Sequence, residues 1–383
     1  MDMAEDLMKK NFPHGAVFRG SQWKDAASGR QYENDLTVVI DSFALVVECK
    51  AGRVTDPAKR GAPLRFKRTL EDLILEPANQ TKRFIEYLMA NRGLSVLRAT
   101  GGGENRIDST KVKYYIPLGI TIEDMGCISS NIKEAIRAGV MRQKIGSLIP
   151  SISVCALECV FELLDSEVER IHYLARRREF EHHVDYVGDE IDLLGFYLEN
   201  GFNIGSVEYT GLSALLAGKS KELDPYFTAK AIGKKVNKPS LQMTKWWKDI
   251  INQMCRKRPA HWTEVGFMLL NSTKEDQEKF EHELRCLKSK LKRGRMDHDY
   301  NWVAFLSGPE QRRYFIVGFP YIDLVRSERN SAIQGIFSAQ DRQGARGAVC
   351  IGINVKTKEY PYSFLAADVE THLLDVEDID RKK

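Results

Sequence analysis

Two short apolar runs near the N-terminus are the clearest structural signal in this chain. Residues 36–40 and 44–47 are rich in β-branched side chains, and the polar residues Asp41 and Ser42 lie between them. Two such runs around a polar turn predict a β-hairpin. The hairpin then fixes which side chains share a face of the sheet, because successive residues of a strand point to opposite faces.

The segments around this hairpin predict an α/β layer. A short helix is expected over residues 4–10, and a basic, turn-like segment over residues 53–68. A helix follows over residues 77–90, since it opens on a proline, which is favoured at the first helical position. A further strand is expected over residues 113–122. Strands that alternate with helices in this way are typical of an α/β fold.

The pattern changes beyond about residue 150. Residues 155–164 and 167–178 predict helices, and the stretch 219–259 is polar and basic. A second set of alternating elements follows: a strand over 262–270, a helix from about Thr273, a hairpin over 302–306 and 314–319, and strands over 349–355 and 362–365. We therefore expect three regions, namely an N-terminal α/β domain over 1–160, a helical linking region over 161–260 and a C-terminal α+β region over 261–383.

Composition places the chain among globular proteins. Of its 383 residues 43% are hydrophobic and 29% are charged, which excludes a disordered chain or a disulfide-rich miniprotein. No stretch approaches the ~18 consecutive apolar residues of a membrane span, and the acidic N-terminus lacks the features of a secretory signal. The seven cysteines are an odd number and widely spread, so we expect reduced thiols, no membrane association and a cytoplasmic protein.

The expected hairpin brings charged residues together. With a two-residue turn at Asp41 and Ser42, one face is wholly apolar. On the other face Asp35 lies opposite Glu48, and Glu33 lies opposite Lys50. Directly opposed residues are about 4.5–5.5 Å apart at Cβ, and like charges there destabilise a sheet.

A divalent cation would neutralise this pair of carboxylates. Hard cations take carboxylate oxygens, and Mg²⁺ is usually held by one or two carboxylates together with waters and substrate phosphate. Lys50 would offer its ammonium to a phosphate or to an attacking water. The chemistry indicated is metal-assisted phosphodiester hydrolysis. The alternative is an ordinary charged hairpin end, with Lys50 and Glu33 as a surface ion pair, and a one-residue slip in register would also separate the carboxylates.

The segment 33–50, followed by Gly52 and by Gln80 on the next helix, resembles the PD-(D/E)xK nuclease superfamily. It is most similar to the nuclease-related-domain and Mrr-like branches, in which an E-x-D strand precedes a V-V-E-x-K strand. The resemblance covers about residues 1–160. Two features depart from the pattern: the helix before the first strand is short, and Phe84 lies where related nucleases often carry Tyr.

The resemblance implies a restriction-endonuclease-like core, a central mixed sheet flanked by helices, with Mg²⁺ (or Mn²⁺) between the strands. Asp35 and Glu48 would then be the metal ligands, helped by the backbone carbonyl of Cys49. Lys50 would orient water and stabilise the phosphorane, and Gln80 would match the glutamine of the following helix. Glu33 would be the first acid of the E-x-D strand.

Six basic residues follow the Glu-x-Lys strand directly and could line a phosphate track to the metal. These residues are Arg53, Lys59, Arg60, Arg65, Lys67 and Arg68. The other interpretation is a solvated loop. His182 and His183 give no ligand spacing, so structural roles are expected for them.

We therefore expect a metal-dependent nuclease acting on nucleic acid, with DNA as the favoured substrate and bacterial genome defence or DNA processing as the setting that the resemblance implies. The competing hypothesis is a non-catalytic nucleic-acid-binding or scaffold protein that keeps the fold. The C-terminal region is expected to select substrate or bind a partner. Cutting both strands of a duplex would need two sites and hence a homodimer.

Overall fold

The computed structural model describes residues 1–25, 28–142, 145–294, 301–338 and 344–369. The chain divides into two units. Met1–Leu198 and Tyr209–Ser240 belong to the first unit, and Glu199–Glu208 and Leu241–Leu373 to the second. No described helix is both long enough and apolar enough to cross a bilayer.

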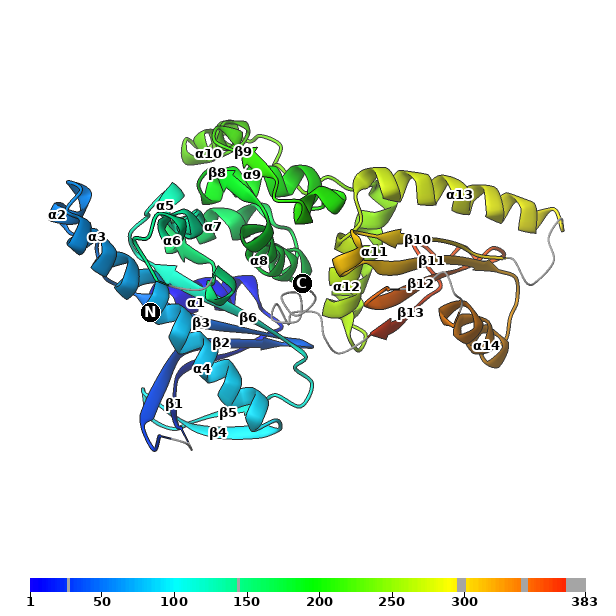
Figure 1. Ribbon diagram of the computed structural model, residues 1–383. Coiled ribbons are helices and arrows are strands. Elements are labelled where there is room, and N and C mark those ends of the chain that lie inside the picture. The colour runs from blue at the N-terminus through cyan, green and yellow to red at the C-terminus, as the bar shows by residue number, and fades with distance from the viewer. Residues whose placement is uncertain (26–27, 143–144, 295–300, 339–343, 370–383) are drawn as a thin grey trace. The chain divides into compact units, whose positions relative to one another are not determined.

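The first unit is built on a seven-stranded mixed sheet in the order β5-β4-β1-β2-β3-β6-β7 (Figure 1). Its strands are β1 (Ala16–Lys24), β2 (Gln31–Ile40), β3 (Phe43–Lys50), β4 (Leu94–Ala99), β5 (Glu104–Asp108), β6 (Tyr114–Thr121) and β7 (Ser151–Ser153). β2 and β3 are antiparallel, whereas β3, β6 and β7 are parallel to one another. The expected α/β fold with a large mixed sheet flanked by helices is confirmed at this level.

The helices of this unit precede, interrupt and follow the strands of the large sheet. They are α1 (Asp2–Asn11), α2 (Asp56–Lys59), α3 (Pro63–Leu70), α4 (Glu76–Ala90), α5 (Cys127–Ser130), α6 (Ile132–Arg137), α7 (Val154–Leu163), α8 (Glu167–His183), α9 (Glu190–Asn200) and α10 (Asp224–Ala231). A two-stranded sheet of β8 (Asp185–Val187) and β9 (Ser213–Leu215) completes it. α4 covers one face of the large sheet, where Val46 packs with Phe84 and Leu88.

The β2–β3 hairpin has the predicted register. Leu36 pairs with Val47 and Ile40 pairs with Phe43, so the turn falls on Asp41 and Ser42. Asp41 adopts a φ of 48°, a left-handed conformation that aspartate tolerates better than most residues. Alternation along the strands therefore places Val46 under α4 and sends Leu36 to the opposite face.

The segment expected to be turn-like, residues 53–68, is instead largely helical. Pro57 and Pro63 lie in the first turns of α2 and α3, where a missing N–H costs nothing. α3 continues through a π-helical turn, Glu71–Leu75, into α4. The helix expected from Pro77 thus begins at Pro63, and the wider turn ahead of Pro77 accommodates a proline inside a continuous helical run.

The expected boundary at residue 160 falls inside α7. Phe161 of α7 contacts Phe12, with ring centroids 5.5 Å apart, and Arg170 of α8 donates to the Asn11 carbonyl. His14 donates its backbone N–H to Glu167, 3.0 Å away. Because these contacts tie α7 and α8 to the first turns of the chain, residues 161–198 fold with the N-terminal unit.

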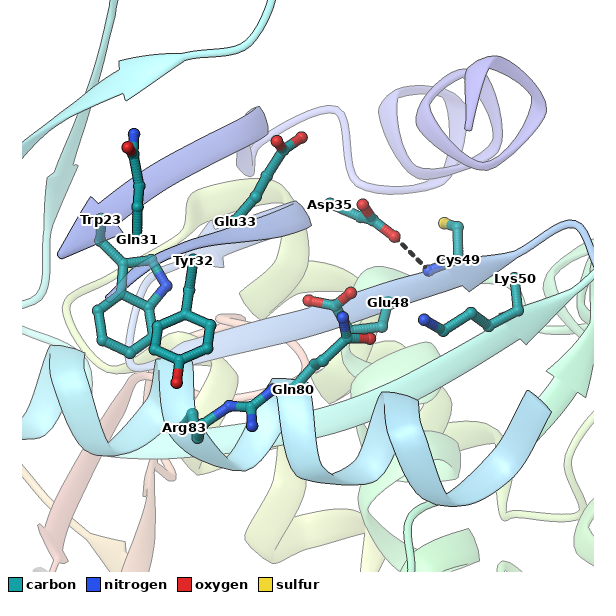
Figure 2. A pocket seen from close by; sticks show the side chains of 10 residues that line it. All are labelled: Trp23, Gln31, Tyr32, Glu33, Asp35, Glu48, Cys49, Lys50, Gln80 and Arg83. Atoms are coloured by element: carbon teal, nitrogen blue, oxygen red, sulfur yellow. Dashed lines mark hydrogen bonds between the residues drawn. The ribbon is translucent and has the colours of Figure 1, made fainter. Parts of the chain in front are cut away.

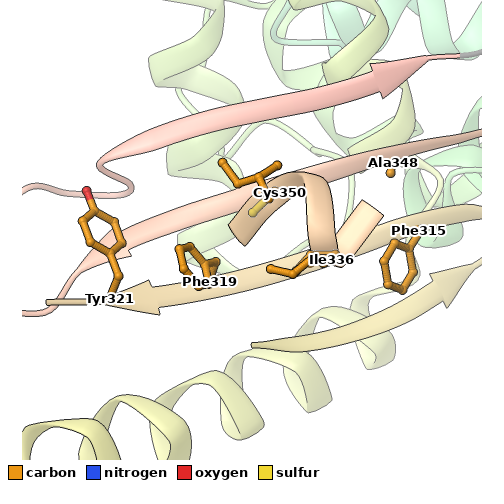
Figure 3. Packing of buried hydrophobic residues seen from close by; sticks show 8 residues of the cluster. Phe315, Phe319, Tyr321, Ile336, Ala348 and Cys350 are labelled. Carbon is orange, nitrogen blue, oxygen red and sulfur yellow. The ribbon is translucent and has the colours of Figure 1, made fainter. Parts of the chain in front are cut away.

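The second unit has a four-stranded sheet in the order β10-β11-β12-β13. Its elements are α11 (Lys245–Lys257), α12 (Trp262–Leu270), α13 (Lys274–Lys292), β10 (Val303–Ser307), β11 (Tyr314–Tyr321), α14 (Arg326–Phe337), β12 (Gly347–Asn354) and β13 (Phe364–Val369). Alternate residues of β11, such as Phe315 and Phe319, pack with Ile336 of α14 (Figure 3). Gly318 faces the other way and lies against Phe280 of α13.

One element of this unit was predicted wrongly. Residues 262–270 were expected to form a strand and form the helix α12 instead. All nine residues are buried, Thr263 and Glu264 among them, so no exposed polar face marks the period that would separate a helix from a strand.

Candidate active site

A pocket of about 450 Å³ opens between the β2–β3 face of the sheet and α4 (Figure 2). Ten side chains line it: Trp23, Gln31, Tyr32, Glu33, Asp35, Glu48, Cys49, Lys50, Gln80 and Arg83. Every residue expected at the catalytic and metal sites is among them. Three strands and one helix contribute, so the pocket depends on the hairpin register and on the placement of α4.

Asp35 lies where the β2–β3 ladder ends. The paired residues run only as far as Leu36 and Val47, so Asp35 and Glu48 are not a regular cross-strand pair. Asp35 Oδ2 instead accepts the backbone N–H of Cys49 at 2.7 Å (Figure 2). This bond fixes the carboxylate beside β3 and leaves its second oxygen to the pocket.

Glu48 is the most buried acid of the pocket, with 2% of its surface exposed. Its Oε1 accepts a 2.9 Å hydrogen bond from Asn34 Nδ2. Asn34 is itself held, because its Oδ1 accepts from the Thr37 hydroxyl at 2.6 Å. The pKa of the Glu48 carboxyl is raised to about 8, first by burial and then by the charge of Asp35, while Asn34 and Lys50 oppose the rise.

Lys50 and Glu33 do not form the cross-strand contact that was expected. Lys50 Nζ lies 3.2 Å from Glu76 Oε2 of α4, and Glu33 accepts a long, 3.5 Å hydrogen bond from Gln22. The β2–β3 ladder ends at Leu36 and Val47, before Glu33 and Lys50 could pair. The Glu76 side chain is 55% exposed, so Lys50 can exchange this partner for a ligand in the pocket at little cost.

The oxygen atoms around the pocket suit a hard divalent cation. Asp35 and Glu48 supply carboxylates, and Gln80 Oε1 is buried without a hydrogen-bond partner among the described residues. Burial raises the pKa of the Cys49 thiol to about 12, so Cys49 would contribute its carbonyl and not a thiolate.

No three His, Cys, Asp or Glu side chains within the described ranges are grouped so that they could hold a metal ion. A cation at Asp35 and Glu48 would thus need amide or carbonyl oxygens, waters and substrate phosphate to complete its coordination. Such a shell is usual for Mg²⁺.

The six basic residues expected to follow the pocket lie outside its lining. They are on α2 and α3 or in the turns beside them, which extend past the end of α4 (Figure 1). Lys59 is paired with Glu123, and Lys67 Nζ lies 3.9 Å from Glu71. Arg53, Arg60 and Arg65 are exposed. The segment is therefore a basic stretch outside the pocket and not its wall.

Four lining residues were not expected: Trp23, Gln31, Tyr32 and Arg83. Trp23, Gln31 and Tyr32 come from outside segment 33–50, which carried the motif. Arg83 follows Gln80 by three positions, and residues with this spacing share a helix face. This spacing is the one signal in the sequence that could have pointed to Arg83.

Comparisons with protein-family models, with curated proteins and with solved structures give no match to this chain.

Proposed function

We propose that the first unit is a metal-dependent nuclease that hydrolyses phosphodiester bonds. The observation that carries the proposal is a 2%-exposed carboxylate, Glu48, beside Asp35 in an open pocket that also holds Lys50 and Gln80. A buried carboxylate next to a second one is costly unless a cation or proton neutralises it. The resemblance of segment 33–50 to PD-(D/E)xK nucleases favours the cation.

Asp35, Glu48, Gln80 and the Cys49 carbonyl would hold Mg²⁺ or Mn²⁺, which when bound polarises the phosphoryl group and lowers the pKa of a bound water. The Asn34 amide keeps one oxygen of Glu48 oriented, and the Cys49 N–H does the same for Asp35. Lys50 would leave Glu76 and place its ammonium against the phosphoryl oxygens as charge develops there. The attacking water would give up a proton to solvent as its oxygen bonds to phosphorus. The bond from phosphorus to the ester oxygen would break, and that oxygen would take a proton from solvent.

The nucleic-acid substrate is proposed to be DNA, in genome defence or DNA processing in the cytoplasm, as the family resemblance implies. The exposed basic residues on and beside α2 and α3 would attract the phosphate backbone. We assign substrate selection or partner binding to the second unit, and a homodimer if both strands of a duplex are cut.

Magnesium-dependent cleavage is the direct test. Labelled single-stranded DNA, double-stranded DNA and RNA are incubated with the full chain, with Glu48→Gln and with Lys50→Ala. Both variants are expected to lose about 10²-fold or more in rate, as removal of a group that stabilises transition-state charge does. Glu86→Gln, an exposed acid on the same helix α4, is the matched control and should keep full activity. Equal rates in wild type and Lys50→Ala would contradict the proposal.

A second candidate is a non-catalytic nucleic-acid-binding or scaffold protein. The small number of acidic ligands favours it, since no group of three ligating side chains occurs among the described residues. This candidate predicts DNA binding by the wild type with no cleavage in either Mg²⁺ or Mn²⁺. Cleavage that disappears in Glu48→Gln would exclude it.

A further inference from the structure

Three side chains form a stack at the end of the pocket away from Lys50 (Figure 2). The ring centroids of Trp23 and Tyr32 are 5.2 Å apart, and the guanidinium carbon of Arg83 lies 4.7 Å from the centroid of the Tyr32 ring. Trp23 is 7% exposed and therefore fixed. The stack sets the position of the Arg83 guanidinium without using its N–H groups, because a cation over an aromatic face is held by the ring.

Arg83 has no acidic partner, although acids line the same pocket. Within the described part of the chain no carboxylate lies within 4.0 Å of its guanidinium, whereas Lys50 is paired with Glu76. A guanidinium offers five donors in a fork that matches the oxygens of a phosphate. Trp23 Nε1 is a second donor at this end, and it is buried without a partner among the described residues.

We propose that Arg83 binds a phosphate of the substrate next to the one that is cleaved, with Tyr32 and Trp23 as its positioning residues. This inference rests on the proposed nuclease function and specifies its substrate: a chain with at least two consecutive phosphates, not a mononucleotide. Gln80 and Arg83 are three positions apart on one face of α4, so one ligand can meet both. A pocket of about 450 Å³ has the size of a small-ligand site, enough for one nucleotide unit.

The binding test uses the full chain in EDTA, so that no cleavage occurs. Fluorescence anisotropy with a labelled single-stranded DNA of about 12 nucleotides gives Kd between about 50 and 200 mM salt, a range in which phosphate contacts weaken steeply. Arg83→Gln should weaken binding about fivefold or more, and the slope of log K against log salt should fall by about 0.7, the value for one lost contact on a single strand. A variant that only loosened the packing would not reduce the salt slope by the amount expected for one phosphate contact.

Matched variants separate the role of Arg83 from a change of charge or fold. Lys82→Gln removes a neighbouring charge that lies outside the pocket and is paired with Glu86, and it should leave Kd and slope as in the wild type. Tyr32→Phe keeps the ring and should bind as the wild type does, whereas Tyr32→Leu should weaken binding. Arg83→Lys should bind DNA more weakly than the wild type and more tightly than Arg83→Gln, because lysine keeps the charge but lacks the fork of donors.

Competition tests whether Arg83 binds the second phosphate of a nucleic-acid chain or the phosphate of any mononucleotide. In the wild type a 5′-phosphorylated dinucleotide should displace the labelled DNA at about tenfold lower concentration than thymidine monophosphate, as one added charge-assisted contact implies, and Arg83→Gln should lose most of this difference. Equal competition by both compounds in the wild type would overturn the inference. No binding by the wild type, or equal Kd and slope for Arg83→Gln and Lys82→Gln, would do so too.

Failure of this inference can be told from failure of the nuclease proposal. Cleavage that depends on Glu48 together with DNA binding that is indifferent to Arg83 removes the inference alone. Binding that depends on Arg83 without any cleavage leaves a phosphate-binding pocket and removes the nuclease.

Discussion

Asn34 orients the Glu48 carboxylate through a hydrogen bond. It is fully buried and donates to both the Val47 carbonyl, at 3.1 Å, and Glu48 Oε1, at 2.9 Å. Asn34→Leu would remove a donor that favours the charged carboxylate, and loss of such supporting bonds typically costs about 10–100-fold in metal affinity. Calorimetric titration with Mg²⁺ should show this loss, while Glu86→Gln should titrate as the wild type does. Unchanged affinity in Asn34→Leu would show that no metal uses Glu48.

His182 gives a prediction on stability that does not involve the pocket. The pKa of this imidazole is lowered from 6.5 to about 3, first by burial and then by the charge of Arg178, and its Nε2 lies 3.3 Å from the Leu148 carbonyl. A lowered folded-state pKa means that stability present above pH 6.5 is lost as the pH falls toward 3.

Urea unfolding at pH 7 and pH 5 tests this sign. Between pH 7 and pH 5 the free energy of unfolding of the wild type should fall by about 1–2 kcal/mol more than that of His182→Gln. His282→Gln, at an exposed position on α13, is the control and should follow the wild type. Parallel pH dependence of all three proteins would contradict the assignment.

At the scale of single residues, the motif could be located from the sequence, but its supporting contacts could not. Asp35, Glu48 and Lys50 lie in one pocket because the apolar pattern fixes the hairpin register. The partner of Lys50 is Glu76, from a helix whose placement no local pattern reveals. The bond from Asn34 to Glu48 depends on where the β2–β3 ladder ends, which alternation alone does not set.

Among the elements, the sequence predicted the short apolar strands and missed helices such as α3 and α12. The β2–β3 hairpin was predicted from two short apolar runs around a polar turn, and β11 from a short apolar run. α12 is buried on all sides, and its sequence predicted a strand. α3 was missed because two prolines and a glycine mark turns as often as they mark helix starts.

Gly20 is a residue of β1 with a left-handed backbone conformation. Its φ is +61°, and a Cβ there would lie 2.7 Å from the Thr100 side chain. Gly20→Ala should cost about 2 kcal/mol or more in unfolding free energy, because a left-handed conformation alone costs an L-residue about 1–2 kcal/mol and the contact adds to it.

Gly61→Ala is the matched control for this prediction. Its φ is +85°, but nothing lies within 4 Å of a Cβ at that position. The difference between the two variants in urea unfolding therefore measures the contact with Thr100. Equal destabilisation by both variants would show that the backbone conformation accounts for all of the effect.

At the scale of the whole chain, the second unit includes a short segment from earlier in the sequence. Arg312 Nη2 lies 2.9 Å from Glu208 Oε2, and Arg312 Nη1 lies 2.7 Å from Asn271 Oδ1. Both members of the ion pair are buried. Composition cannot reveal that a segment packs with a unit that follows much later in the chain. The sequence therefore predicted three consecutive regions, whereas contacts divide the chain into two units.

Arg312→Ala would remove the buried guanidinium that lies 2.9 Å from Glu208 Oε2. Breaking one partner of a buried pair costs about 3–5 kcal/mol, so we expect a large fall in the melting temperature of the second unit in calorimetry. Arg326→Ala, at an exposed position on α14, is the control and should stay within about 0.5 kcal/mol of the wild type. Equal melting of both variants would mean that the pair stabilises nothing.

The central claim is that Asp35 and Glu48 share a divalent cation. Anomalous diffraction from crystals soaked in Mn²⁺ tests it most directly, with Glu48→Gln crystals as the control. We predict a peak about 2.0–2.3 Å from a carboxylate oxygen of each residue, the usual range for such ligands, and its absence from the variant. A wild-type pocket without a peak at saturating Mn²⁺, with both carboxylates contacting only protein atoms, would contradict the claim.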